Sequence, residues 1–144
     1  MTFNDNVKFI ELKAPGKSSR IEGKEVLLVL PDNWKAIASI LKNESDLNFD
    51  YLMCITSMDI GEGKLALSYN LHSTELNHSI EFKLIFNEDI SIPSVESLWK
   101  TADWHEREAF DMMGIYFIGH PDLRRVLLPE GFAGHPLRKD YVYE

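Results

Sequence analysis

Two stretches in which apolar residues alternate with mostly polar ones constrain the fold more than any other feature of this chain. Apolar residues occupy every second position from 65 to 71 and again from 80 to 86. A period of two predicts strands with one buried and one exposed face. A third apolar run, residues 51–58, precedes them, and Gly61-Glu-Gly63 supplies a short turn. Together these runs predict an antiparallel meander.

The segment ahead of the meander predicts one further strand and one helix. Residues 25–30 form a short apolar run that Pro31 ends, and Asp32 is expected to cap the helix that follows. Apolar residues then recur at helical spacing from Trp34 to Leu41, which predicts an amphipathic helix over 33–43 that covers the buried face of the sheet. Residues 1–24 show no clean period.

A second helix is expected after the meander. Asp103 and Glu106 have the spacing of a capping box, residues 104–113 should be helical, and Gly114 should end the helix in the left-handed conformation. The order β-α-β-β-β-α predicts an α+β two-layer domain over residues 1–114. Its sheet should be antiparallel or mixed, contain about four strands and be covered by helices.

The C-terminal segment, residues 115–144, loses this periodicity. It holds three of the six prolines, and half of the eight glycines lie from Gly114 onward. Its apolar residues nevertheless need burial, which argues against disorder. We expect an extended segment that belongs to the same domain and is not independent of it.

This segment contains a short internal repeat. Gly119-His-Pro-Asp-Leu-Arg-Arg125 recurs as Gly134-His-Pro-Leu-Arg-Lys139. In both copies proline favours an extended conformation for the histidine before it. Extended backbone leaves N–H and C=O groups that, if buried, need a partner.

The distribution of arginine also separates the two parts. Four of the five arginines lie at or beyond Arg107, whereas nine of the ten lysines lie at or before Lys100. Arginine suits buried and interface ion pairs, so the segment is interpreted as a partner-binding surface. The alternative is that it docks on its own domain, with the arginines pairing Glu106, Glu108 and Asp111. The two interpretations are compatible.

Charge and cysteine content exclude several functions. A net charge of −8 gives no electrostatic footprint for nucleic acid. The single cysteine, Cys54, cannot form an internal disulfide or a thiolate cage for an iron–sulfur cluster. No apolar run is long enough to span a bilayer, and residues 1–10 resemble no signal peptide, so a bacterial cytoplasmic location is expected.

A small metal-dependent enzyme is the alternative of another class. His105 and Glu108 share a helix face, and a histidine of the C-terminal segment could join them. Ala109 stands where a zincin motif would need its second histidine. The glycines at 61 and 63 fit a dinucleotide-binding pattern formally, but a strand follows them instead of a helix. Neither a nucleophile elbow nor a phosphate loop is present.

The stretch Glu106-Arg-Glu-Ala-Phe-Asp-Met-Met-Gly-Ile115, with the two His-Pro elements after it, resembles the signature of the C subunit of respiratory complex I. That resemblance implies an α+β fold and a non-catalytic role in the peripheral arm of a proton-translocating NADH:quinone oxidoreductase. It implies that this chain carries no cofactor, because FMN and the iron–sulfur clusters belong to partner subunits. The implied partners are the D and B subunits of complex I, which hold the quinone site and the terminal cluster, on the cytoplasmic side of the cell membrane. A homologous scaffold subunit of a membrane-bound energy-converting hydrogenase is the alternative.

The candidate site is therefore a partner-binding surface, and no catalytic, cofactor-binding or metal-binding residue is expected. The candidate residues are Glu106, Arg107, Glu108, Asp111, His120, Pro121, Leu123, Arg124, Arg125, His135, Pro136, Leu137, Arg138 and Lys139.

Overall fold

The computed structural model describes residues 2–128 and 133–139, and within them the chain forms helices around a mixed sheet. The helices are α1 (Phe3–Lys13), α2 (Pro31–Asn43) and α3 (Ala102–Met113). The sheet strands are β1 (Ser18–Arg20), β2 (Val26–Val29), β3 (Tyr51–Gly61), β4 (Lys64–Ser73) and β5 (His78–Asn87). A separate parallel pair joins β6 (Ile92–Pro93) to β7 (Phe117–Ile118).

The strand order of the large sheet is β1-β2-β5-β4-β3. The predicted meander is confirmed, because β3, β4 and β5 pair as consecutive antiparallel neighbours. Strand β2 pairs with β5 in parallel, which makes the sheet mixed. The predicted α+β class is confirmed, and the strand beyond the expected four is β1, in the region without a clean period.

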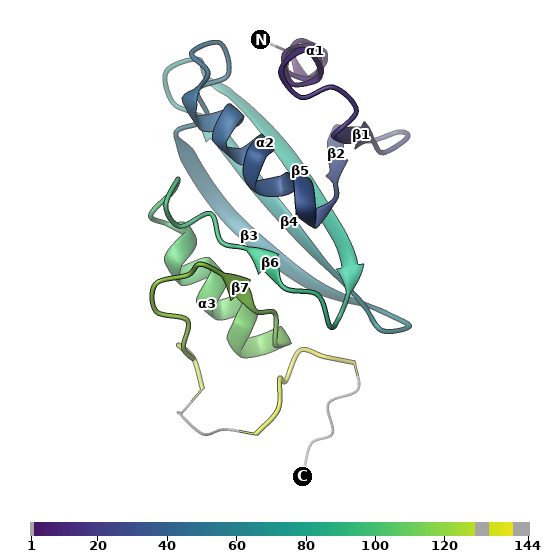
Figure 1. Ribbon diagram of the computed structural model, residues 1–144, viewed down its shortest axis with the longest axis vertical. Coiled ribbons are helices and arrows are strands. Elements are labelled where there is room, and N and C mark those ends of the chain that lie inside the picture. The colour runs from purple at the N-terminus through teal and green to yellow at the C-terminus, as the bar shows by residue number, and fades with distance from the viewer. Residues whose placement is uncertain (1, 129–132, 140–144) are drawn as a thin grey trace.

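Helix α2 forms the second layer of the core. It lies across the face of β4 and β5 (Figure 1), and its Trp34 is fully buried with its ring centroid 4.6 Å from that of Tyr69 and 5.3 Å from that of Phe82. The expected cap at Asp32 is wrong. The helix begins at Pro31, which suits a first helical position because its missing N–H would be unpaired there, and no side chain caps it.

Helix α1 was not predicted. It begins with a capping box in which Asp5 N–H donates to Thr2 Oγ1 over 3.2 Å and Thr2 N–H donates to Asp5 Oδ2 over 3.1 Å. Of its side chains only Asn6 and Ile10 are buried. Phe3 and Val7 are partly buried against the core at helical spacing from Ile10, but Phe9 and the exposed Leu12 break that spacing in the sequence.

Helix α3 lies alongside β3, the edge strand of the sheet (Figure 1). Its end at Gly114 is confirmed, with φ +76°. The predicted capping box is wrong, because the helix begins earlier, at Ala102, and Thr101 forms no side-chain cap. Asp103 and Glu106 bond other segments of the chain instead.

Beyond Gly114 the chain first stays with the core and then loses regular structure. Ile115 and Phe117 are buried, and Phe117 lies opposite Ile92 in the β6–β7 pair. Residues 119–128 and 133–139 contain neither helix nor strand, and they are called the tail below. The division at residue 114 stays a prediction, and part of the predicted segment, 129–132 and 140–144, lies outside the described residues. None of the helices in the described ranges is long and apolar enough to cross a membrane.

Candidate functional site

Asp111 is the main anchor of the tail. Its carboxylate is fully buried, and its Oδ2 accepts the backbone N–H groups of Val126, Leu127 and Leu128 over 3.2, 2.8 and 3.0 Å. Its Oδ1 accepts from Arg125 Nη1 over 2.8 Å. Burial alone would raise the pKa of Asp111, but these donors outweigh it and lower the pKa. The anchor is therefore a charged acceptor that fixes a turn of the tail.

Two arginines complete this anchor. Arg107, on α3, donates from Nε to the carbonyl of Arg124 over 3.3 Å and from Nη2 to the carbonyl of Arg125 over 3.5 Å. Arg125 in turn donates from Nη2 to the carbonyl of Gly134 over 2.8 Å. Arg125 thus links the first His-Pro element to the second.

The second His-Pro element docks on the C-terminal end of α3. His135 Nδ1 lies 3.0 Å from the carbonyl oxygen of Asp111, Leu137 N–H donates to that of Met112 over 3.0 Å, and Arg138 donates to that of Met113 over 3.2 Å. These groups bind the last carbonyl oxygens of α3, which have no hydrogen-bond partner within the helix. The arginine is also favoured there, because the C-terminal end of a helix attracts positive charge.

Gly114 makes this docking possible. A Cβ at this position would lie 2.7 Å from His135 Cδ2, closer than carbon atoms can approach. The left-handed backbone that ends α3 also disfavours any residue with a side chain. Gly114 therefore serves both the helix end and the packing of the histidine.

Arg138 and Lys139 fasten the tail to the far end of the sheet. Arg138 forms ion pairs with Glu88 and, over 3.5 Å, with Asp59, while the backbone N–H of Lys139 donates to Asp59 Oδ2 over 2.8 Å. The N–H groups of Lys139 and Gly61 lower the pKa of Asp59. Sequence reasoning missed Asp59 and Glu88, because no local pattern marks them.

Glu106 holds the first His-Pro element from inside the core. It is fully buried, and its oxygens accept from Ser94 Oγ over 2.6 Å and from Val95 N–H over 2.9 Å. His120 Nε2 lies 4.0 Å from Glu106 and 3.0 Å from Asp103 Oδ1. Burial raises the pKa of Glu106, partly offset by the hydrogen bonds from Ser94 and Val95.

Most predicted charged residues therefore meet at α3, and the expected docking on the chain's own domain is seen. It takes place through Asp111 and Arg125, whereas no ion pair joins an arginine to Glu106 or Glu108 within the described ranges. Among the described residues Arg124 pairs with Asp122 alone, and both side chains are more than half exposed. Of the remaining candidates, Leu123 packs against the core, Pro136 is half-buried and Pro121 is exposed.

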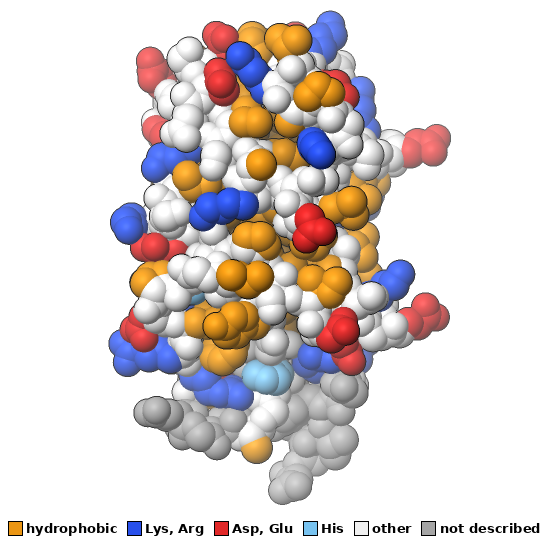
Figure 2. All heavy atoms as spheres, in the orientation of Figure 1, with side chains coloured by type: hydrophobic (Ala, Val, Ile, Leu, Met, Phe, Trp, Pro, Cys, Tyr) orange, Lys and Arg blue, Asp and Glu red, His pale blue; other side chains and the backbone are white. Residues whose placement is uncertain are grey.

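The α3 residues Glu106, Arg107 and Asp111, with Gly114 at the end of the helix, hold the tail and are called the clamp below. Apolar side chains remain exposed around it. They come from α3, β7 and the tail, and Figure 2 shows hydrophobic side chains gathered over α3 and β7, just above basic side chains. These residues are Trp104, Tyr116, Ile118, Leu127 and Leu137, each at least half exposed. Apolar groups next to a rigid polar anchor are typical of a surface that a partner covers.

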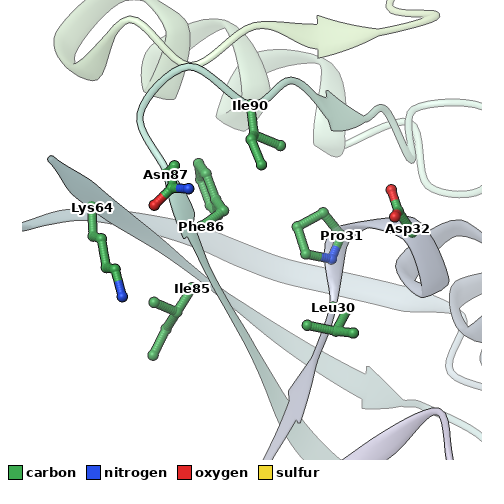
Figure 3. A pocket seen from close by; sticks show the side chains of 8 residues that line it. All are labelled: Leu30, Pro31, Asp32, Lys64, Ile85, Phe86, Asn87 and Ile90. Carbon is green, nitrogen blue, oxygen red and sulfur yellow. The ribbon is translucent and has the colours of Figure 1, made fainter.

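Two hollows open at the surface, and the second borders the docked tail at Leu137. One, of about 300 Å³, opens between the start of α2 and the end of β5, where Leu30, Pro31, Ile85, Phe86 and Ile90 surround it (Figure 3). The other, also about 300 Å³, lies between β3 and α3 and includes His105 and Glu108. Within the described residues no group of three or more His, Cys, Asp or Glu side chains could hold a metal ion.

Known proteins resemble this chain along most of its length. The family model "Respiratory-chain NADH dehydrogenase, 30 Kd subunit" matches residues 27–144. The C subunit of NADH-quinone oxidoreductase from Chloroherpeton thalassium is 48% identical over 112 residues, which cover 76% of this chain and 47% of the relative. NADH-ubiquinone oxidoreductase subunit 9 of Reclinomonas americana is 42% identical, over 83% of this chain and 60% of the relative. The chain thus spans about half of the first relative's length.

Two solved structures share the fold. One component of the membrane-bound sulfane sulfur reductase, an archaeal respiratory membrane complex, aligns with a TM-score of 0.80 at 26% identity, over 96% of this chain and 85% of that one. The trypsin-resistant fragment 1–134 of Nqo5 aligns with a TM-score of 0.63 at 25% identity, over 85% of this chain and the whole fragment.

Proposed function

Because the chain belongs to the family of the 30 kDa subunit of respiratory-chain NADH dehydrogenase, we propose that it is a non-catalytic peripheral-arm subunit of a proton-translocating NADH:quinone oxidoreductase. In this role it supports the transfer of electrons from NADH, through FMN and iron–sulfur clusters, to quinone. The complex, as a whole, is the enzyme.

The observation that carries the proposal is that the signature residues on and after α3 bind other parts of the same chain. Glu106, Arg107, Asp111 and Gly114 each hold another part of the chain in place. A charged residue already saturated by backbone donors is not free for acid–base work. The clamp instead preorganises the tail, which lowers the ordering entropy that a partner must supply on binding.

Membership of the family supports the proposed cofactor and partner assignments. FMN and the iron–sulfur clusters lie in partner subunits. For the clusters this agrees with the one cysteine of the chain, which falls short of the usual four thiolate ligands. The partners are the D and B subunits of the complex, which contact the tail and the exposed apolar residues beside it. In the proposed complex this subunit lies at the cytoplasmic side of the membrane, and none of the helices in its described residues could span it.

A second candidate is the same scaffold role in a related respiratory membrane complex with another electron donor. The alignment with the sulfane sulfur reductase component supports this second candidate, because the aligned region covers nearly all of this chain. The identity of the other subunits separates the two candidates.

The test is deletion of the gene followed by assay of the membranes. NADH:quinone reductase activity should be lost, the peripheral-arm subunits should leave the membrane fraction, and the wild-type gene should restore both. Unchanged activity with an intact complex would contradict the proposal. Loss of a different donor:acceptor activity alone would favour the second candidate.

A further inference from the structure

Strand β3 is an edge of the five-stranded sheet, and its outward side faces α3 across a hollow. Residues 54–57 line this hollow consecutively. Successive side chains of a strand point to opposite faces, so four in a row border one space only when that space lies along the strand's edge. The hollow therefore gives access to the backbone of β3.

The register identifies which backbone groups point into it. Gly61 and Lys64 close a two-residue turn whose central residues both have positive φ, and such a turn is flanked by a hydrogen-bonded pair. The backbone N–H and C=O groups of Lys64 thus bond β3. Along β4 the backbone groups of successive residues then point alternately to β3 and to β5. Leu67 and Tyr69 consequently bond β5, and their partners on β3, Ser57 and Ile55, point their N–H and C=O groups away from β4.

An independent contact supports this alternation. Leu52 lies opposite Leu71, another β4 residue that bonds β5, and its carbonyl accepts from Thr101 Oγ1 over 3.0 Å on the outward side. No such bond serves the outward groups of Ile55 and Ser57 from any described residue. An edge with unpaired backbone groups is a template for another strand.

The walls of the hollow favour a particular occupant. Ala109, Met112 and Leu137 supply an apolar wall, and Glu108 supplies a carboxylate that no described cation pairs. The complement of this surface is an extended segment with an aliphatic side chain toward the apolar wall and a lysine or arginine toward Glu108.

We propose that this hollow receives an extended, basic segment of a partner subunit, which adds to β3 as a further strand. The proposal rests on the proposed function, because the partner is a subunit of the same complex. The segment bonds the N–H and C=O groups of Ile55 and Ser57 and forms an ion pair with Glu108. It lies beside the docked tail, whose Leu137 borders the hollow.

Amide hydrogen exchange in the isolated chain and in the purified complex tests the proposal. The Ile55 and Ser57 amides should exchange quickly in the isolated chain and about 100-fold more slowly in the complex. Thr56 is the internal control, because its N–H bonds β4 in both states. Fast exchange of Ile55 and Ser57 in a complete complex would overturn the strand addition while leaving the proposed function intact. Protection of both amides in the isolated chain would also overturn it.

Two substitutions probe the same contacts. Ser57→Pro removes one outward N–H, which an edge strand tolerates, and should weaken copurification of the partner about tenfold, whereas Ser57→Ala keeps the N–H and the partner. If Ser57→Pro fails to fold, Glu108→Lys tests the charge without touching the backbone. Full partner recovery with Glu108→Lys, together with unprotected amides, would refute the proposal. Loss of the whole complex from wild-type preparations would instead count against the proposed function.

Discussion

Replacing Asp111 with asparagine should release the tail without unfolding the domain. The side chain keeps its shape but loses its charge and one of its two acceptor oxygens. Four donors now share those oxygens: three backbone N–H groups, at 126–128, and Arg125. Hydrogen bonds to a charged group contribute about 1.5–3 kcal/mol each, against about 0.5–1.5 kcal/mol between neutral groups.

The expected loss is smaller than four such differences, because the donors regain water once the tail lifts. About 2–4 kcal/mol of docking free energy should disappear. Since each 1.4 kcal/mol is a factor of ten, exchange of the Leu127 and Leu128 amides should accelerate about 30- to 700-fold. Residue-resolved hydrogen exchange on the isolated chain measures this, and the amides of β4 should keep their protection.

Asp122→Asn is the matched control. Within the described part of the chain that carboxylate bonds the exposed Arg124 and no other group, and exposed ion pairs contribute at most about 1 kcal/mol. Exchange in the tail should therefore change by no more than about fivefold. If Asp111→Asn behaves like this control, the anchor does not hold the tail and the reasoning is refuted.

Three further predictions follow from the same contacts. Gly114→Ala forces a side chain into left-handed backbone and against His135, so the free energy of unfolding should fall by about 1–3 kcal/mol in urea titrations, and an unchanged midpoint would contradict the packing. Burial raises the pKa of Glu106 in the folded chain above its ordinary value of 4.5. The free energy of unfolding should therefore fall as the pH rises from 4.5 through the higher pKa of the folded chain, because Glu106 then becomes charged while buried. Glu106→Gln should flatten that decline in thermal unfolding across pH, and an unaltered slope would contradict it. Arg124→Ala should leave the melting temperature of the isolated chain unchanged but weaken assembly with the partner subunits. Arg138→Ala should lower the melting temperature and also weaken assembly. Equal melting temperatures for these two variants would contradict the assigned contacts.

The sheet and its covering helix were predictable because their patterns are local. The alternation from 80 to 86 survives in β5, which packs one face against α2 and exposes Ile85 on the other. In β4 the expected exposed face is wrong for residues 65–69, because Ala66 and Ser68 are buried as well. Helix α1 escaped prediction because Phe9 and the exposed Leu12 interrupt the helical spacing of its core-facing side chains. The false capping box at Asp103 shows the limit of a local motif, because tertiary bonds claimed both of its carboxylates.

The clamp was only partly predictable. The resemblance to the C subunit of complex I is confirmed by the comparisons, and the echoed His-Pro elements drew attention to the residues that dock. The partners of Arg138 could not be found from sequence, because Glu88 lies 50 positions away, and Asp59 lies 80 positions from Lys139. Nothing local distinguishes these carboxylates from others on the surface.

The most direct test of the subunit role is affinity purification of the tagged chain from mildly solubilised membranes, with the bound proteins identified and NADH:quinone reductase activity assayed in the eluate. The account predicts coelution of iron–sulfur and quinone-site subunits together with that activity. Recovery of a clean monomer, without partners or activity, would contradict it.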